Sequence, residues 1–389
     1  MQKHSLAAGI FLIVSLISPA QVIAESSVDQ MEEDIFRDMN LDGITVFWEK
    51  IIADYGNFMP DLQKVSIFEG LNNVDKNMFT QFFLNILQFF FHELIVNGKL
   101  LGIIIVLAIF SSILETMHSA FEQSSIQRIS FFIVYLVLIF ISLNSFYTVF
   151  DYINGAISTM SSFMIALIPL ILGLMATFGN LISVAFFHPI IIILIELSSL
   201  LISKFILPVL LVSALFMLVS NLNPNYSVTH FAKLLRTIAL ASLGIFFTIF
   251  ISIISVQGAA NAIQDGVALK TAKFVTANFV PVIGRTFIDA TDTVLSATLI
   301  LKNTVGIAGV IITLLIVLFP ALKVLSITLL FKFSAAIIQP IASEQIVTCL
   351  QVIGNYMSYM LACLLGLSFM FFLGIVIIIA ASNITLLLQ

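Results

Sequence analysis

The sequence predicts an all-α, polytopic membrane protein with about seven to nine transmembrane helices, a signal peptide and a small extracytoplasmic N-terminal helical segment. Of its 389 residues, 60% are hydrophobic and only 10% are charged, whereas about 25% of a soluble domain is charged. Apolar runs of roughly 18 residues or more recur from Lys99 to the C-terminus, the length that crosses a ~30 Å hydrocarbon layer. These runs are continuously apolar rather than alternating, which argues against a transmembrane β-barrel.

Residues 1–24 have the pattern of a signal peptide. Lys3 precedes a long apolar stretch, and small residues end at Ala24. An uncleaved signal anchor is the alternative interpretation. In both cases the segment that follows is expected to lie outside the cytoplasm.

Residues 25–78 form an acidic extracytoplasmic segment. Between residues 25 and 76 the sequence holds twelve acidic and four basic residues. A helix in its second half carries an apolar stripe that includes Phe47, Trp48 and Ile51. About 50 residues bury little core alone, so this segment is expected to pack on the membrane part or on another protein. The chain has no basic patch for nucleic acid.

Residues 79–98 have two interpretations. Polar side chains recur there at helical spacing among many phenylalanines, and they form one stripe: Gln81, Asn85, Gln88 and His92. The pattern fits an amphipathic helix lying at the membrane interface, although the usual Lys and Arg are missing. It equally fits a first membrane span whose polar stripe faces the other helices.

A transmembrane bundle is expected over 99–257, and C-terminal transmembrane helices over 304–389. The short connection at 178–180 allows a re-entrant pair, hence the range of seven to nine. Prolines interrupt several of the runs, which membrane helices tolerate. The expected segments are 100–118, 129–150, 159–179, 181–203, 205–221, 237–257, 304–321, 323–341 and 354–381.

Basic residues constrain the orientation only weakly. Arg128, Lys233 and Arg236 indicate two cytoplasmic connections, in agreement with an external N-terminal segment. Strict alternation of the spans then places residues 258–303, with their basic side chains, outside. That placement conflicts with the usual bias, and the sequence leaves the side of this segment open.

Glu196 lies in the strongly apolar run IIIILIELSSLL and is the carboxylate expected to be most deeply buried. An ionisable group at membrane depth is a functional candidate. Lys204 is about 12 Å further along a straight helix, too far to pair with it, so Lys332 of another span is a candidate partner. A purely structural ion pair is the alternative.

No enzyme, cofactor or metal site is expected. The five histidines are scattered, and neither a phosphate-binding loop nor a nucleophile elbow occurs. Glu115, His118 and Glu122 share helical spacing, but metal sites of that type need a second helix with the same pattern. Cys349 and Cys363 lie in apolar surroundings and are expected to be packing residues.

Residues 258–303 carry seven of the eighteen charges that follow Lys99. Pro281 and Gly284 predict a break in the helix. From Arg285 onward, a resumed helix places a polar stripe on one face, namely Arg285, Asp289, Asp292, Ser296 and Asn303. Such a stripe faces a conduit or a protein partner. An amphipathic loop on the membrane surface is the alternative.

The stretch AIQDG…KTAKFVTANFVPVIGRTFIDATDTV, from Ala262 to Val294, resembles the signature region of the stage III sporulation protein AE family of spore-forming bacteria. In this stretch the Pro-Val-Ile-Gly turn, which contains Pro281 and Gly284, follows Lys270 and Lys273 and precedes Asp289 and Asp292. The layout of signal peptide, acidic segment and apolar body agrees over the whole chain. The family has no established catalytic residues to transfer.

The resemblance implies a place in the mother-cell membrane that surrounds the forespore. It implies a subunit of a secretion-like channel, or feeding tube, that supports forespore development and late forespore gene expression. The implied partners are the other stage III A-operon membrane proteins, the forespore channel partner and the lipid bilayer, with a homo-oligomer as an open alternative. A stand-alone small-solute permease and a membrane scaffold without a pore are the competing hypotheses.

Overall fold

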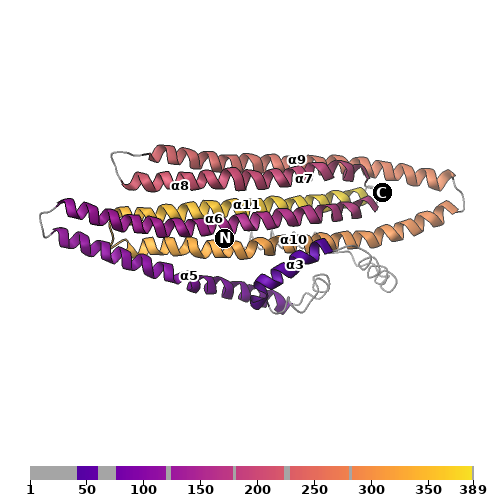
Figure 1. The fold of residues 1–389 in the computed structure, drawn as a ribbon. Helices are drawn as coiled ribbons and strands as arrows, with labels where there is room; N and C mark the ends of the chain where they lie inside the picture. The colour runs from indigo at the N-terminus through magenta and orange to yellow at the C-terminus, as the bar shows by residue number, and fades with distance from the viewer. Residues whose placement is uncertain are drawn as a thin grey trace, which may run out of the picture. The chain divides into compact units, whose positions relative to one another are not determined.

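A computed structural model describes the backbone over 42–59, 76–119, 124–177, 181–222, 228–279 and 283–387. Side chains are described over 43–59, 80–113, 132–176, 184–185, 188–221, 228–257 and 302–380. The predicted signal peptide and most of the acidic segment lie outside these ranges. Every regular element of the described part is helical (Figure 1), which confirms the predicted all-α class.

Two short elements come first, the helix α3 (Asp42–Tyr55) and a 3-10 turn (Gly56–Phe58). The long helices follow, and one of them contains a π-helical turn, η2 (Leu201–Ile206). They are α5 (Lys76–Ser119), α6 (Ser124–Thr177), α7 (Leu181–Leu200), α8 (Leu207–Leu222), α9 (Thr229–Phe279), α10 (Ile283–Ile338) and α11 (Glu344–Leu387).

Six helices of the described part are long and apolar enough to cross a membrane, so the expected number of seven to nine is not confirmed. The difference arises because neighbouring expected segments join into one continuous helix in three places. The joined pairs are 129–150 with 159–179, 181–203 with 205–221, and 304–321 with 323–341. Residues 79–98 and the following span are also continuous, within α5.

Polar residues interrupt the apolar runs without interrupting the helices. Asp151 and Tyr152 lie inside α6, and Lys323 lies inside α10. At 1.5 Å per residue, the 54 residues of α6 extend on the order of 80 Å, well over twice the ~30 Å of hydrocarbon. A drop in hydropathy along such a helix therefore does not mark a connection.

The prolines are accommodated in three ways. Pro169, Pro189 and Pro320 lie inside continuous α-helices. Pro208 is the second residue after the π-helical turn η2, whose wider geometry relieves the clash of the proline ring with the preceding turn. Pro340 lies in the turn after α10, where a helix normally stops.

Helix α10 is central to the packing, since it contacts α3, α5, α6, α9 and α11. In its most apolar window 56% of the residues are buried, compared with 17% in α5. Gly306 and Gly309 permit this closeness, because a Cβ atom there would overlap Ile379 of α11 and Leu167 of α6. Cys349 and Cys363 are buried and unpaired by disulfides, which confirms their expected packing role.

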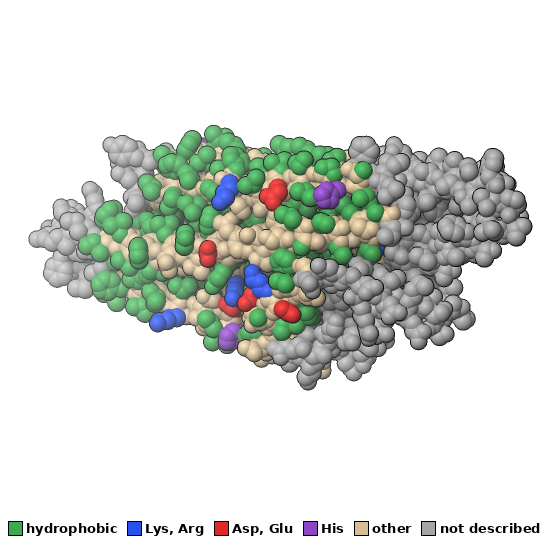
Figure 2. Space-filling view, turned by 45° about the vertical axis from the view of Figure 1, so that its right-hand side comes forward, with side chains coloured by type: hydrophobic (Ala, Val, Ile, Leu, Met, Phe, Trp, Pro, Cys, Tyr) green, Lys and Arg blue, Asp and Glu red, His purple; other side chains and the backbone are tan. Residues whose placement is uncertain are grey.

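The outer surface of the described helices is apolar. Hydrophobic side chains are spread over the described part of the face in Figure 2, with few charged groups among them. Leucine, isoleucine and phenylalanine residues of α5, α6, α7 and α9 are widely exposed, such as Ile95, Phe140 and Ile245. Since a soluble monomer rarely exposes a large contiguous apolar surface, this surface fits contact with lipid.

Candidate functional site

Helix α3 packs on the long helices and brings the charged residues Lys50 and Asp54 to the site. Its apolar stripe is buried, with Ile44 at 1%, Trp48 at 8% and Ile51 at 7% exposure, and it packs on α6 and α10. Phe47 meets Phe163 of α6 edge to face, with ring centroids 5.3 Å apart. The predicted stripe and its packing on the membrane part are confirmed.

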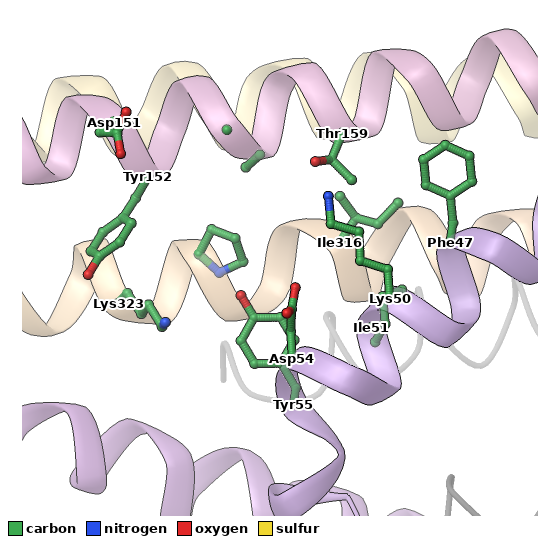
Figure 3. A pocket seen from close by; sticks show the side chains of 13 residues that line it. Phe47, Lys50, Ile51, Asp54, Tyr55, Asp151, Tyr152, Thr159, Ile316 and Lys323 are labelled. Atoms are coloured by element: carbon green, nitrogen blue, oxygen red, sulfur yellow. The ribbon is translucent and has the colours of Figure 1, made fainter.

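A pocket of about 280 Å³ lies between α3, α6 and α10 (Figure 3). Polar and charged groups from all three helices line it together with small and apolar residues. The lining residues are Phe47, Lys50, Ile51, Asp54 and Tyr55 of α3, Asp151, Tyr152, Gly155, Ala156 and Thr159 of α6, and Ile316, Pro320 and Lys323 of α10.

Lys323 of α10 joins the pocket to α5. Its Nζ lies 3.9 Å from Oε1 of Glu93, and 25% of the Lys323 side chain and 14% of the Glu93 side chain are exposed. The same ammonium lies 5.6 Å from the ring centroid of Tyr55 and 5.4 Å from that of Tyr152. Aromatic faces attract a cation at this range. Lys323 is therefore stabilised as a cation by one carboxylate and two rings.

Tyr55, at the end of α3, is fixed by aromatic neighbours. Its ring stacks on Phe319 of α10 at 4.0 Å and meets Phe89 of α5 edge to face at 5.9 Å. Burial raises the pKa of the Tyr55 hydroxyl from 10.0 to about 12, and the negative charges of Asp54 and Glu93 contribute to the increase. Tyr55 is thus a neutral hydroxyl at physiological pH.

Pro320 lies inside α10 and lines the pocket together with Ile316, four residues earlier. A proline has no N–H, so it cannot donate the usual helical hydrogen bond to the carbonyl of Ile316. The Thr159 hydroxyl of α6 adds a polar group to the lining.

Lys50, Asp54 and Asp151 are exposed at the pocket. Within the part of the chain whose side chains are described, none of the three has an ion-pair partner within 4.0 Å. The described residues also contain no group of three or more His, Cys, Asp or Glu suited to a metal ion. The arrangement favours reversible binding of a small polar molecule.

The expected environment of Glu196 is not found. Glu196 is exposed on α7, and Lys332 is exposed on α10. No ion pair joins them in the described side chains. The Lys332 stem instead packs against Gly354 of α11, whose added Cβ would lie 3.0 Å from Cγ of the lysine. Apolar sequence neighbours place a residue in a membrane helix but do not tell which face it occupies.

The structure gives backbone positions for most of the signature residues. Lys270 and Lys273 lie in α9, which ends at Phe279, and Gly284 lies in α10, which begins at Ile283. Three further candidates also lie in α10: Arg285, Asp289 and Asp292. Their side chains, and Pro281 itself, lie outside the described residues. The polar stripe therefore stays a prediction.

Sequence reasoning missed the pocket. Asp151 and Lys323 are ionisable residues inside apolar helices, and that signal alone makes them functional candidates. Lys50 and Asp54 carry no comparable signal, because their segment is rich in charge. Only the packing of α3 on α6 and α10 brings the two sets together.

Comparison with known proteins identifies the family. The family model described as stage III sporulation protein AE matches residues 62–382. A protein of Bacillus subtilis (strain 168) named "Stage III sporulation protein AE" is 46% identical over 364 residues, which cover 93% of this chain and 91% of that protein. No solved structure matches. The chain therefore belongs to the stage III sporulation protein AE family.

Proposed function

We propose that this protein is an integral membrane component of the multi-protein channel that links mother cell and forespore during endospore formation. Family membership over most of the chain is the observation that carries this proposal. The channel supports forespore development and late forespore gene expression. The protein then resides in the mother-cell membrane surrounding the forespore, and it acts as a structural or conducting subunit rather than as an enzyme.

The distribution of basic residues supports one orientation. Successive long helices run antiparallel (Figure 1), so the ends of α5, α8 and α10 lie together with the starts of α6, α9 and α11. Arg128, Lys233, Arg236 and Lys332 belong to these helix ends. Cytoplasmic connections are enriched in Lys and Arg, so we assign this end to the cytoplasm.

The same orientation places the α9–α10 hairpin outside the cytoplasm. Helix α9 continues for 22 residues after Gln257, and α10 begins 19 residues before Lys302. Each arm is roughly 30 Å long at 1.5 Å per residue. The hairpin carries four basic residues of its own, Lys270, Lys273, Arg285 and Lys302, so this orientation rests on the extracytoplasmic N-terminal segment expected before α5. The hairpin is a surface for the other stage III A-operon proteins and the forespore partner.

Co-purification tests the complex. An affinity-tagged copy of the chain is expressed in sporulating Bacillus subtilis that lacks its own AE protein, and membrane proteins retained in mild detergent are identified. We expect stage III A-operon products to be retained, and the Asp289→Asn/Asp292→Asn double variant to lose them at equal abundance. Glu344→Gln, at the start of α11, is the control. If the unaltered tagged chain is purified with lipid but without any stage III A-operon product, the proposal is contradicted.

A stand-alone permease is the second candidate, and the charged pocket between α3, α6 and α10 favours it. Purified protein in liposomes distinguishes the two functions. Solute uptake without any partner supports the permease, whereas uptake that requires the other complex members supports the subunit. A scaffold without a pore predicts no uptake in either preparation, together with normal co-purification.

A further inference from the structure

We infer that the pocket between α3, α6 and α10 binds a small zwitterionic solute, one that carries both an ammonium group and a carboxylate, such as an amino acid. This inference goes beyond the proposed channel role and does not depend on it. The pocket is built from residues of this chain alone, so that purified protein suffices to test it.

The charges of the pocket wall select for a ligand of both signs. Lys50 and Lys323 supply two cations, and Asp54 and Asp151 supply two anions. A ligand that carries only a positive charge is repelled by the two lysines. A ligand that carries only a negative charge is repelled by the two aspartates. A zwitterion gains an opposite charge at both of its ends, and charge-assisted hydrogen bonds are about twice as strong as neutral ones.

The polar groups are distributed along the pocket. In Figure 3 the Lys50 side chain extends toward Thr159 of α6. Asp151 and Tyr152 lie on the same helix, nearer to the other end of the pocket. Asp151 and Thr159 are eight residues apart, about 12 Å along the helix. We assign the ligand carboxylate to Lys50 and Thr159. The ammonium group is assigned to Asp54 and Asp151.

The remaining wall limits the size of the ligand. Gly155, Ala156 and Pro320 line the pocket between the polar groups, so that a short hydrocarbon segment fits beside them. At about 280 Å³, the pocket lies just below the range of roughly 300–1,000 Å³ that is typical of sites for drug-sized ligands. A solute of amino-acid size matches this volume.

Three residues, Lys50, Asp54 and Asp151, are available to bind the ligand without breaking an ion pair of the described part. Lys323 already lies beside Glu93 and two tyrosine rings. Lys50 and Asp54 have no ion pair within the described part, although they are four residues apart on α3. Binding a zwitterion therefore places opposite charges beside these two groups.

Equilibrium dialysis of the full-length protein in detergent tests the inference. The probes are radiolabelled L-alanine and γ-aminobutyrate as zwitterions, with unlabelled acetate and ethylammonium as competitors that carry one charge each. We expect saturable binding of at least one zwitterion. Acetate and ethylammonium are each expected to compete at least tenfold less well than that zwitterion. No saturable binding of either zwitterion overturns the inference, and so does equally strong competition by ethylammonium, which indicates a simple cation site.

Variants assign the binding to this pocket. Lys50→Met and Asp54→Asn are each expected to weaken the affinity at least tenfold, equivalent to about 1.4 kcal/mol. Glu49→Gln of α3 and Lys99→Met of α5 are exposed controls that do not line the pocket. Asp151→Asn changes a residue of α6 rather than of α3, so it tests the pocket without altering the helix α3 that has to dock. Unchanged affinity in all three pocket variants, at an unchanged melting temperature, overturns the assignment.

Discussion

The ammonium group of Lys323 on α10 lies 3.9 Å from the carboxylate of Glu93 on α5, at the junction of two long membrane helices and the N-terminal helix α3. Asn97 donates a hydrogen bond of 3.3 Å to the same carboxylate. This ion pair ties α10, which lines the pocket through Lys323, to the neighbouring helix α5.

The ion pair is expected to contribute to stability through direct coupling. Both side chains are largely buried, so removal of one leaves the other charge poorly compensated. In a double-mutant cycle with Glu93→Gln and Lys323→Met, we expect a coupling energy of about 1–2 kcal/mol. Unfolding in detergent, followed by circular dichroism, measures it. Additivity within about 0.5 kcal/mol contradicts a direct interaction.

Trp48 is expected to hold α3 on the bundle. Its side chain is buried at 8% exposure, and Trp→Ala substitutions at such positions cost about 3–5 kcal/mol. Trp48→Ala should therefore undock α3 while the long helices stay folded. Hydrogen exchange over 42–55 should accelerate at least a hundredfold, with little change in α10 and α11. Val46→Ala is the control, since Val46 is 60% exposed.

Close packing of α6 on α10 requires the absence of a side chain at residue 309. A Cβ atom at Gly309 would overlap the end of Leu167, so Gly309→Ala should destabilise the fold by about 1–3 kcal/mol. Gly173→Ala is the matched control, because nothing lies within 4 Å of its added Cβ atom. It should stabilise α6 by about 0.5–1 kcal/mol. Equal melting temperatures for the two variants would rule out this packing account.

Stability should fall at alkaline pH because of Tyr55. Burial raises its pKa from 10.0 to about 12, so the folded state binds the phenolic proton more tightly than the unfolded state. This contribution is complete below pH 10 and is lost as the pH rises toward 12. Tyr55→Phe keeps the ring on Phe319 but lacks the proton. The variant should lose less stability than the unaltered protein between pH 9 and 11, as measured by thermal unfolding.

The sequence was sufficient to predict the helical class, the membrane location of the long helices and the apolar stripe of α3. Each depends on local pattern: apolar runs fill long helices, and Phe47, Trp48 and Ile51 form an apolar stripe on a short one. The break expected at Pro281 stays a prediction, because that residue lies outside the described part, between the end of α9 at Phe279 and the start of α10 at Ile283.

The number of helices and the site could not be predicted, because both depend on which helices are neighbours. Asp151 and Lys323 lower the local hydropathy and suggest connections, whereas they face a shared pocket inside continuous helices. Glu196 shows the opposite error. Its apolar neighbours suggest burial in protein, but a membrane helix also has a face turned away from the bundle, and Glu196 is exposed.

The most direct test of the central claim is late forespore transcription. A Bacillus subtilis strain that lacks its own AE protein is given this chain, and a fluorescent reporter of late forespore gene expression is followed after engulfment. We predict that the reporter and heat-resistant spores are restored, at least in part, and that the Asp289→Asn/Asp292→Asn variant restores neither despite normal abundance. A chain that reaches the membrane at the abundance of the native protein, yet leaves the reporter silent, would contradict the account.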